Sequence, residues 1–386
     1  MTDQAPWSQA RLLEFEPESE GEDTRPWGLV TDSATTLWSG EEHDVALERS
    51  TAHRGAFTLR TDGPLLHGLP GLEAYEETVH TRTPELRANR TPRRAPSAAP
   101  SGAPYRPKGV PLGTTPKTTR SLGPTRRGIT SRGGKTLLSE THSTIIDGES
   151  RALVYPSSYP YTAVCKLYSS YQPAAGASWV GAGEATGYLI GRSTMMTSGH
   201  VGPPTNGAAW AIKVIPACWN GQSVFGAGVV SYVRGYHSWN SDSGSDIKVC
   251  QLWDPLGDRV GYFGYRGYNS AWEDGEYWTM AGFPYDISLT SMSYESAIAV
   301  RDDDDGDDIN VNGTTYDTTQ VESDADEASG VSGAPLWGMW DDGPYAIGVH
   351  HGVEHDGTVF GTETLSCASG GAGFTQAAAW GRSSWG

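Results

Sequence analysis

The sequence predicts a mainly β protein, and three observations carry that prediction. Glycine and proline occur 49 and 24 times, and both residue types punctuate chains that are built of short strands and tight turns. Valine, threonine and tyrosine, which favour extended backbone, are common. No long apolar stripe repeats at the spacing of a helix. With 386 residues, 37% of them hydrophobic, the chain can bury a core of about 200 to 250 residues and leave an appendage.

The predicted strands begin after "STIIDGES", residues 143–150, where short apolar runs start to alternate with polar or glycine-rich breaks. Each run is predicted to form one or two strands. In chain order the runs are 161–168, 185–191, 193–201, 208–219, 226–236, 245–253, 276–286, 293–302, 334–353 and 357–365. No repeat of the length found in propellers or solenoids occurs. This part of the chain is therefore predicted to be one β domain.

The first part of the chain, up to about residue 142, has a different composition. It is acidic at first, and then no Asp or Glu occurs between Arg87 and Lys135, where Arg, Lys, Pro, Ser and Gly dominate. Such a segment buries too little apolar surface to fold alone. We interpret it as a solvated linker in preference to a nucleic-acid-binding arm.

Charge and hydropathy exclude several classes of function. The formal net charge of −18 opposes general binding to nucleic acid or to an anionic membrane. No apolar run is long enough for a membrane span, and the first residues lack the apolar core of a secretory signal. Four cysteines permit two disulfides in three pairings, and buried free thiols are equally compatible: Cys165, Cys218, Cys250 and Cys367. Their spacing fits neither a zinc site nor a CxxC pair.

A serine lies within a tight cluster of small residues in "EASGVSGAP", residues 327–335. A serine hydroxyl becomes a good nucleophile when a base takes its proton and nearby donors stabilise the oxyanion. Small residues at Gly330 and Gly333 would let the backbone turn so that the N–H groups of Gly330 and Ser332 point at one spot. An ordinary glycine-rich turn would explain the cluster equally well if no other motif matched it.

Two further motifs do match the serine. In "STMMTSGHV" an apolar strand runs into a turn that ends at His200, and in "SGSDIKVCQL" a polar turn delivers Asp246 to the start of a buried strand. Either residue alone is more often structural than catalytic. The chain order His, Asp, Ser is that of the chymotrypsin arrangement rather than of subtilisin or the α/β-hydrolases.

The boxes "TSGHV", "SDIKV" and "GVSGAP" resemble those of chymotrypsin-like serine endopeptidases. The flanking segments "STIIDGESRALVYPSSYPYTAVCKL", "DPLGDRVGYFGY", "TMAGFPYD" and "AIGVHHGV" are similar to the bacterial glutamyl endopeptidases of Bacillus and Staphylococcus. The resemblance covers about residues 143 to 370. It implies two antiparallel six-stranded β-barrels with the site in the cleft between them, protein or peptide substrates, a monomer, no cofactor, no metal and secretion.

The resemblance also assigns roles to the residues of these boxes. His200 would accept the proton of Ser332 and pass it to the leaving amine, while Asp246 would fix the imidazole tautomer. The N–H groups of Gly330 and Ser332 would form the oxyanion hole of an acyl-enzyme mechanism. A non-catalytic binding protein on the same scaffold is the alternative, because fold alone does not guarantee function.

The domain boundary follows from the same resemblance. Residues 1–142 are expected to be a poorly ordered, removable pro-region, and residues 143–386 the peptidase domain. Cleavage is expected between about Lys135 and Ser150, and Glu140 offers a bond for self-processing if the enzyme cuts after glutamate.

Specificity depends on which residues line the primary pocket. His350 stands where the glutamyl endopeptidases carry the histidine that contacts the acidic substrate side chain, which implies cleavage after Glu and less well after Asp. An ungapped count instead puts Asp326 where trypsin-like enzymes bind Arg or Lys, with Glu327 beside it. A two-residue insertion would place Asp324 at the family's own Asp and turn Asp326 and Glu327 outward, and we favour that alignment.

Several features depart from the family pattern. Val331 replaces the acidic or amide residue before the serine, which puts trypsin-style activation in doubt, and no cysteine lies near Thr186 to brace the histidine loop. The run 301–308, "RDDDDGDD", fails the EF-hand pattern and is expected to be a solvated acidic loop rather than a calcium site. His350, His351 and His355 are not expected to share a metal, because neighbouring residues on a strand point to opposite faces.

Overall fold

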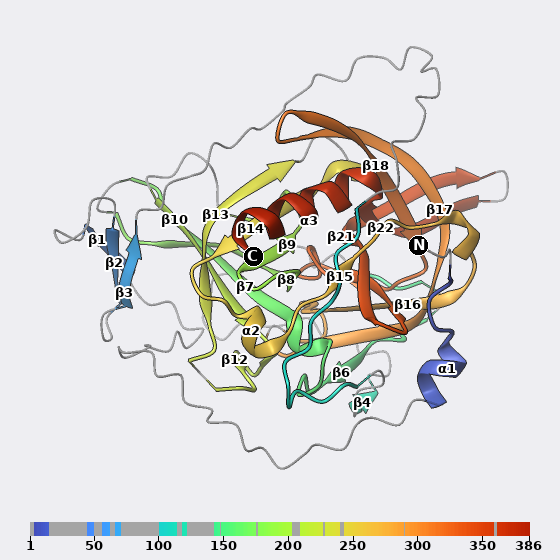
Figure 1. The fold of residues 1–386 in the computed structure, drawn as a ribbon, viewed down its shortest axis with the longest axis horizontal. Coiled ribbons are helices and arrows are strands. Elements are labelled where there is room, and N and C mark those ends of the chain that lie inside the picture. Colours follow the sequence, from blue (N-terminus) through green and yellow to red (C-terminus); the bar gives the residue numbers. More distant parts are fainter. Residues whose placement is uncertain are drawn as a thin grey trace.

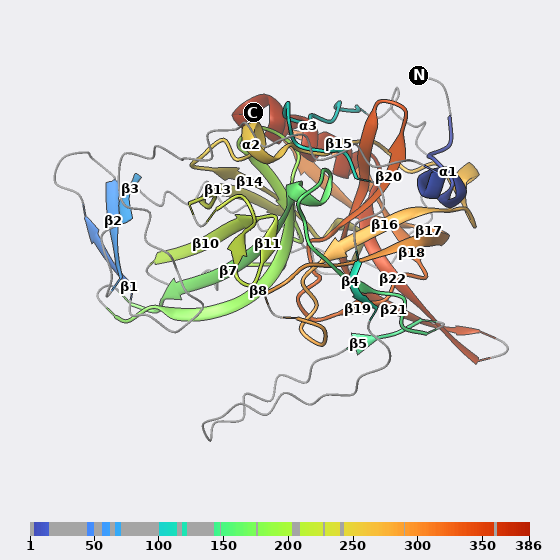
Figure 2. The ribbon, with the colours of Figure 1, turned by 90° about the horizontal axis from the view of Figure 1, so that it is seen from below.

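The first six-stranded barrel forms as the family resemblance implies. The computed structural model describes residues 4–14, 45–49, 56–61, 66–70, 100–113, 118–121, 143–146, 148–174, 177–202, 209–226, 228–239, 243–288, 290–358 and 361–386. Six antiparallel strands close in the order β10-β13-β14-β9-β8-β7. Their bounds are β7 Val164–Gln172, β8 Val180–Leu189, β9 Thr194–Thr197, β10 Ala209–Pro216, β13 Ser231–Trp239 and β14 Ile247–Leu252. The barrel lies to the left in Figure 2.

A second, larger sheet lies beside the barrel (Figure 2). Its path is β16-β20-β21-β22-β18-β17-β6-β4, β15 adds to β21, and β16 also pairs with β17, so the sheet curls back on itself. The strands are β4 Thr118–Ser121, β6 Ala152–Val154, β15 Gly264–Tyr265, β16 Glu276–Gly282, β17 Ser293–Val311, β18 Thr314–Ser323, β20 Pro335–Trp340, β21 Gly343–Thr358 and β22 Gly361–Gly370. Six strands, β16, β20, β21, β22, β18 and β17, take the place of the predicted second barrel within this nine-stranded sheet.

The acidic run 301–308 is strand rather than the expected loop. It forms the middle of β17, where Asp303 pairs with Val321 and Asp305 with Thr319 of β18. The expectation was wrong because backbone pairing with β18 offsets the weak strand preference of aspartate, and residues 301–305 stay exposed so that their charges remain in water.

Short elements complete the fold. The two-residue strands are β5 Ser143–Thr144, β11 Cys218–Trp219, β12 Gln222–Ser223 and β19 Glu327–Ala328. The 3-10 turns are η1 Tyr161–Ala163, η2 Ser243–Ser245 and η3 Ser270–Trp272, and α2 spans Gly257–Val260. Strands β1 Val45–Arg49, β2 Ala56–Thr61 and β3 Leu66–Pro70 form a separate three-stranded sheet.

A C-terminal helix, α3 Gly371–Trp385, was not predicted. It runs across β14 and β18 in Figure 1 and so touches both the barrel and the second sheet. Phe374, Ala377 and Ala378 of α3 are buried. Its three glycines and its aromatic residues hide the helical pattern in the sequence, and burial of one face supplies most of its stability.

Besides β4, which pairs with β6, two described segments of the expected pro-region pack against the β domain. Near the start, the N–H of Trp7 donates to Met339 O at 2.7 Å, and Leu12 in α1 (Gln9–Glu14) is buried. Farther along, Tyr105 exchanges backbone hydrogen bonds with Tyr262, and Val110 is buried in the main core.

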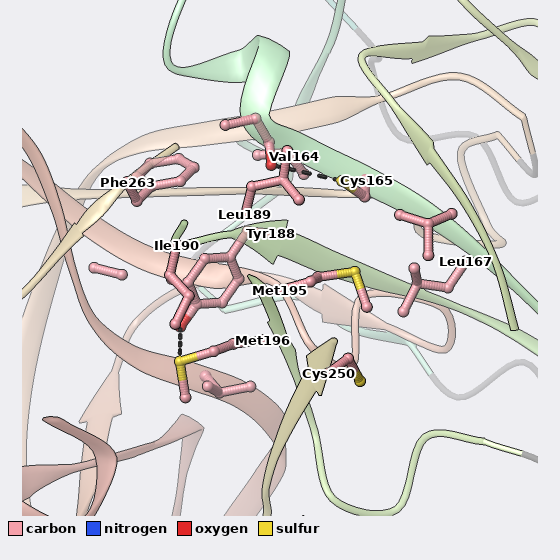
Figure 3. Close-up of a cluster of buried hydrophobic side chains, with 14 of the residues drawn as sticks. Val164, Cys165, Leu167, Tyr188, Leu189, Ile190, Met195, Met196, Cys250 and Phe263 are labelled. Atoms are coloured by element: carbon pink, nitrogen blue, oxygen red, sulfur yellow. Dashed lines mark hydrogen bonds between the residues drawn. The ribbon is translucent and has the colours of Figure 1, made fainter. Parts of the chain in front are cut away.

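The barrel is filled by a sulfur-rich apolar core (Figure 3). Tyr188, Leu189, Met195 and Met196 are fully buried, and the Tyr188 hydroxyl lies 3.9 Å from the sulfur of Met196. All four cysteines are buried with free thiols, which is one of the two arrangements that the sequence left open. Among the described residues, none of the helices has the length and apolar character needed to cross a membrane.

Candidate active site

The pairing of two barrel strands brings His200 and Asp246 together. Strand β14 pairs antiparallel with β9, and Lys248 lies opposite Thr197. His200 follows Thr197 by three residues and Asp246 precedes Lys248 by two, so both reach the same edge of the barrel. Neither position depends on a long loop.

Both carboxylate oxygens of Asp246 contact His200. Oδ1 accepts the backbone N–H of His200 at 2.8 Å, and Oδ2 lies 2.5 Å from Nδ1. The Asp246 side chain is 8% exposed, whereas that of His200 is 42% exposed. A carboxylate that faces Nδ1 favours the tautomer with hydrogen on Nδ1, and this leaves Nε2 as the basic nitrogen.

Ser332 lies on a loop that is bonded on both sides. The Ser332 carbonyl accepts the N–H of Thr186 in β8 at 3.0 Å, and the N–H of Gly333 donates to the His350 carbonyl in β21 at 2.7 Å. The loop therefore bridges the barrel and the second sheet. The Ser332 side chain is half-buried.

One carbonyl oxygen joins the histidine loop to the serine loop. The Ser198 hydroxyl, two residues before His200, donates to His350 O at 2.6 Å. The N–H of Gly333, next to Ser332, donates to the same oxygen at 2.7 Å. His200, Asp246 and Ser332, which the sequence singles out, thus belong to one connected region.

The serine loop needs glycine at Gly330 and Gly333, as the sequence suggests. Their φ angles are +99° and +90°, which residues with a Cβ rarely adopt. A Cβ on Gly330 would meet Phe283 O at 2.4 Å, and one on Gly333 would meet Thr186 O at 2.0 Å. Any larger residue would push the loop away from its supports.

Two carbonyl anchors set the direction of the N–H groups in this loop. Ser329 O accepts the N–H of Tyr285 at 2.9 Å, and Val331 O accepts the N–H of Ala334 at 2.8 Å. In a trans peptide the N–H points opposite to the C=O, so the N–H groups of Gly330 and Ser332 point away from these anchors. Among the described residues, neither N–H has a hydrogen-bond acceptor.

Thr186 is a supporting residue whose role the sequence analysis did not foresee. Its hydroxyl donates to Gly330 O at 2.8 Å and accepts the N–H of Phe283 at 3.2 Å. Val331, whose side chain is buried in an apolar cluster, anchors the same loop without charge. No motif in the sequence pointed to this role, because it depends on the long-range contact between β8 and the serine loop.

His350 and Glu327 face each other beside this loop. Nε2 of His350 lies 3.3 Å from Oε2 of Glu327, and Nδ1 lies 3.3 Å from the hydroxyl of Ser366 in β22. His350 is only 1% exposed and Glu327 is 8% exposed. The prediction that Glu327 turns outward is therefore wrong, and its backbone pairing with Thr144 of β5 holds it inward.

Asp326 is also buried, but its partners differ from those expected for an Arg-binding aspartate. Its carboxylate accepts the N–H groups of Ile146 at 2.7 Å and Ser150 at 3.1 Å. Its own N–H donates to Glu295 at 2.7 Å. Backbone amides already satisfy this carboxylate. The prediction that Asp326 turns outward is therefore wrong, and so is the alternative that it binds the Arg or Lys of a substrate.

Asp324 takes part in a different contact. It accepts two hydrogen bonds from the Arg301 guanidinium, the shorter at 2.6 Å, and one from the N–H of Ala299 at 2.8 Å. The Asp324 carboxylate is thus bound by two residues of β17.

Burial shifts the titration of groups around the site. It raises the pKa of Glu295 to about 8, with the charge of Asp326 as the second cause, and it raises the pKa of Asp326. Burial also lowers the pKa of His351 to about 4. His351 is therefore neutral at neutral pH, whereas Glu295 is largely protonated.

Three potential metal ligands lie together on β18, β21 and β22. Glu322, Glu354 and Cys367 have ligand atoms within 4.8 Å of one another. The Gln320 amide donates to both carboxylates, and burial raises the pKa of the Cys367 thiol. This group is closed by its own hydrogen bonds. The side chain of His355 lies outside the described residues.

A closed β-barrel beside a curled β-sheet, with His200, Asp246 and Ser332 at their junction, defines a protease domain of the chymotrypsin fold. The chain belongs to the trypsin family: the family model described as Trypsin matches residues 154–364, which is more than half of its length.

Comparison with individual proteins gives more distant matches. The chain is 24% identical over 217 residues to a glutamyl endopeptidase of Bacillus licheniformis, covering 54% of this chain and 60% of that protein. It is 27% identical over 252 residues to an extracellular metalloprotease of Bacillus subtilis, covering 62% of this chain and 71% of that protein. A solved structure of a Glu endopeptidase in complex with MPD aligns with a TM-score of 0.45 and 18% identity, over 62% of this chain and all of that one. The chain thus spans less than two thirds of the licheniformis protein.

Proposed function

We propose that this protein is a serine endopeptidase that hydrolyses peptide bonds through an acyl-enzyme. The observation that carries the proposal is the contact of both Asp246 oxygens with His200, at 2.8 and 2.5 Å. With hydrogen held on Nδ1, Nε2 of His200 accepts the Ser332 proton as the oxygen attacks the substrate carbonyl. His200 then protonates the leaving amine. In the second half of the reaction, His200 takes a proton from water, which attacks the acyl-enzyme and releases the carboxylic acid product and free Ser332.

The loop around Ser332 supplies the stabilisation that this chemistry needs. The N–H groups of Gly330 and Ser332 donate to the oxyanion that forms on the substrate. Their carbonyl anchors on Tyr285 and Ala334 keep them aimed before substrate arrives, and donors that need no reorganisation stabilise the transition state best.

We propose that His350 reads the residue before the scissile bond and favours Glu over Asp. Its backbone is bonded to Gly333 and Ala334, the two residues that follow Ser332. An imidazole can donate a hydrogen bond to a carboxylate, and a buried anion favours its charged form. The licheniformis relative, by its name, is a glutamyl endopeptidase.

We also propose that residues 1–142 are a removable pro-region and that the mature protein is secreted and monomeric. Cleavage between Lys135 and Ser150 would create a new amino terminus near β5. In β5, Thr144 pairs with Glu327 and Ser143 pairs with Ala328 of β19. Sequencing the amino terminus of active material tests the boundary, and an active form that starts at Met1 contradicts it.

A fluorophosphonate probe separates the enzyme from a non-catalytic binding protein. The purified protein is expected to label at Ser332, and Ser332→Ala is expected to abolish both labelling and peptide hydrolysis, with a loss on the order of 10⁶ in turnover. Ser329→Ala, three residues earlier on the same loop, is the matched control and keeps the label. Failure of the native chain to label or to cleave any peptide would favour the binding protein.

A further inference from the structure

Glu327 occupies the nitrogen of His350 that an acidic substrate would use. Nε2 of His350 lies 3.3 Å from Oε2 of Glu327, and the other ring nitrogen lies 3.3 Å from the Ser366 hydroxyl. Because His350 is 1% exposed, the ring has little room to turn toward a second partner. The substrate group must therefore approach a nitrogen that already faces a carboxylate.

The position of Glu327 is fixed by the backbone on both sides. Its strand pairs with β5, where Glu327 lies opposite Thr144, and the preceding residue, Asp326, is held by Ile146 and Ser150. Glu327 also precedes Ser332 by only five residues. The carboxylate is thus a buried and fixed part of the segment that leads to Ser332 rather than a surface charge.

The charges of this arrangement oppose an ionised glutamate. Oε2 of Glu327 already lies 3.3 Å from Nε2 of His350, so a substrate carboxylate would bring a second carboxylate to the same buried nitrogen. Two carboxylates that face one imidazole repel each other strongly when water is excluded.

A carboxamide meets the same pair without this conflict. Its oxygen can accept a hydrogen bond from Nε2 of His350, while its NH₂ can donate to the Glu327 carboxylate. Glutamine and glutamate have the same shape, so the pair discriminates between them by charge and by hydrogen-bond donors alone.

We propose that Glu327 is a specificity-determining residue that weakens cleavage after glutamate and admits glutamine at the same position. This inference rests on the proposed function, because it assumes that His350 reads the residue before the scissile bond. It adds to that function a residue, Glu327, that disfavours an acidic substrate side chain before the scissile bond.

The test uses peptides that differ only in Glu or Gln before the scissile bond, and three forms of the full chain. In Glu327→Gln the ratio of kcat/KM for Glu over Gln is expected to rise about tenfold or more, because one like charge is removed and the shape is kept. Asp324→Asn is the matched control, since it removes the same charge from a carboxylate bound to Arg301. Its ratio is expected to stay within twofold of the native value.

A rise of less than threefold in Glu327→Gln, or an equal rise in Asp324→Asn, would overturn the inference. Fluorophosphonate labelling of Ser332 in each form shows whether the catalytic machinery is intact, so loss of labelling marks a failure of the proposed function instead. Calorimetry with Ser332→Ala, with and without Glu327→Gln, measures binding of product peptides ending in Glu or Gln. The same change of preference is expected there without turnover, and its absence would also refute the role of Glu327.

Discussion

The hydroxyl of Thr186 donates a hydrogen bond of 2.8 Å to the carbonyl oxygen of Gly330. The donor belongs to the first barrel and the acceptor to the serine loop, which is fused to the second sheet. This bond holds the peptide group between Gly330 and Val331, and so bears on the two N–H groups to which we assign the oxyanion.

Thr186→Val keeps the size of the side chain and removes this bond. We expect kcat to fall about 10- to 100-fold with little change in KM, because a displaced oxyanion donor costs transition-state stabilisation rather than substrate binding. Thr186→Ser restores the hydroxyl and is expected to recover most of kcat. Equal kcat values in Thr186→Val and the native protein would show that Gly330 needs no such support.

Asp246→Asn preserves the shape around His200 and removes the charge. An amide NH₂ can donate to Nδ1 and stabilise the wrong tautomer, so we expect kcat to fall by about 10⁴ at neutral pH. Steady-state kinetics and the rate of fluorophosphonate labelling should fall together. Labelling at the native rate would mean that His200 does not depend on Asp246 for its tautomer.

Val331→Asp tests the apolar anchor of the serine loop. Val331 is 3% exposed and packs in an apolar cluster, so an ionised side chain there should destabilise folding by about 3 to 5 kcal/mol. Val331→Ala, which only creates a small cavity, should lose about 1 to 2 kcal/mol. Urea unfolding of both variants measures the difference. Equal stability of Val331→Asp and Val331→Ala would mean that a cation pairs with the introduced aspartate.

Glu295→Gln tests the buried carboxylate pair at Asp326. Burial, followed by the charge of Asp326, raises the pKa of Glu295 to about 8 in the folded protein. The unfolded value is lower, so the folded state binds more protons and the contribution of Glu295 is lost as pH rises from about 4.5 through 8.

Removing the titrating group should flatten that dependence. We expect the free energy of unfolding of the native protein to fall between pH 5 and pH 9 by on the order of 3 kcal/mol more than that of Glu295→Gln. Urea unfolding at pH 5, 7 and 9 gives both curves. Parallel curves would show that Glu295 titrates normally in the fold.

Much of the barrel could be predicted from the sequence because its strands carry strong local signals. Each of the first six predicted runs overlaps one barrel strand, and the run before His200 contains the whole of β9. β18, Thr314–Ser323, was missed because its first half is polar and reads as a loop, and only pairing with β17 and β22 makes it a strand. Long-range pairing of this kind leaves no mark on local composition.

The candidate site was also predictable only where its residues carry a local sequence signal. The residues of the serine, histidine and aspartate boxes could be proposed from their order and spacing, whereas the partners of acidic residues could not. Asp326 and Glu327 are adjacent in the chain, yet one meets backbone amides and the other meets an imidazole. The pleat sends neighbouring side chains to opposite faces, and only the register of β19 with β5 decides which face holds which partner.

In our proposal the imidazole of His350 serves substrate selectivity, whereas its backbone carbonyl serves assembly of the loops. Its carbonyl oxygen, which every amino acid possesses, accepts the bonds from Ser198 and Gly333, while its imidazole meets Glu327. A library that randomises residues 327 and 350 together would therefore leave the scaffold of the reacting groups in place and alter only what it recognises. Such a chain is well suited to laboratory evolution, because new preferences can be sampled without first rebuilding the machinery that breaks the bond.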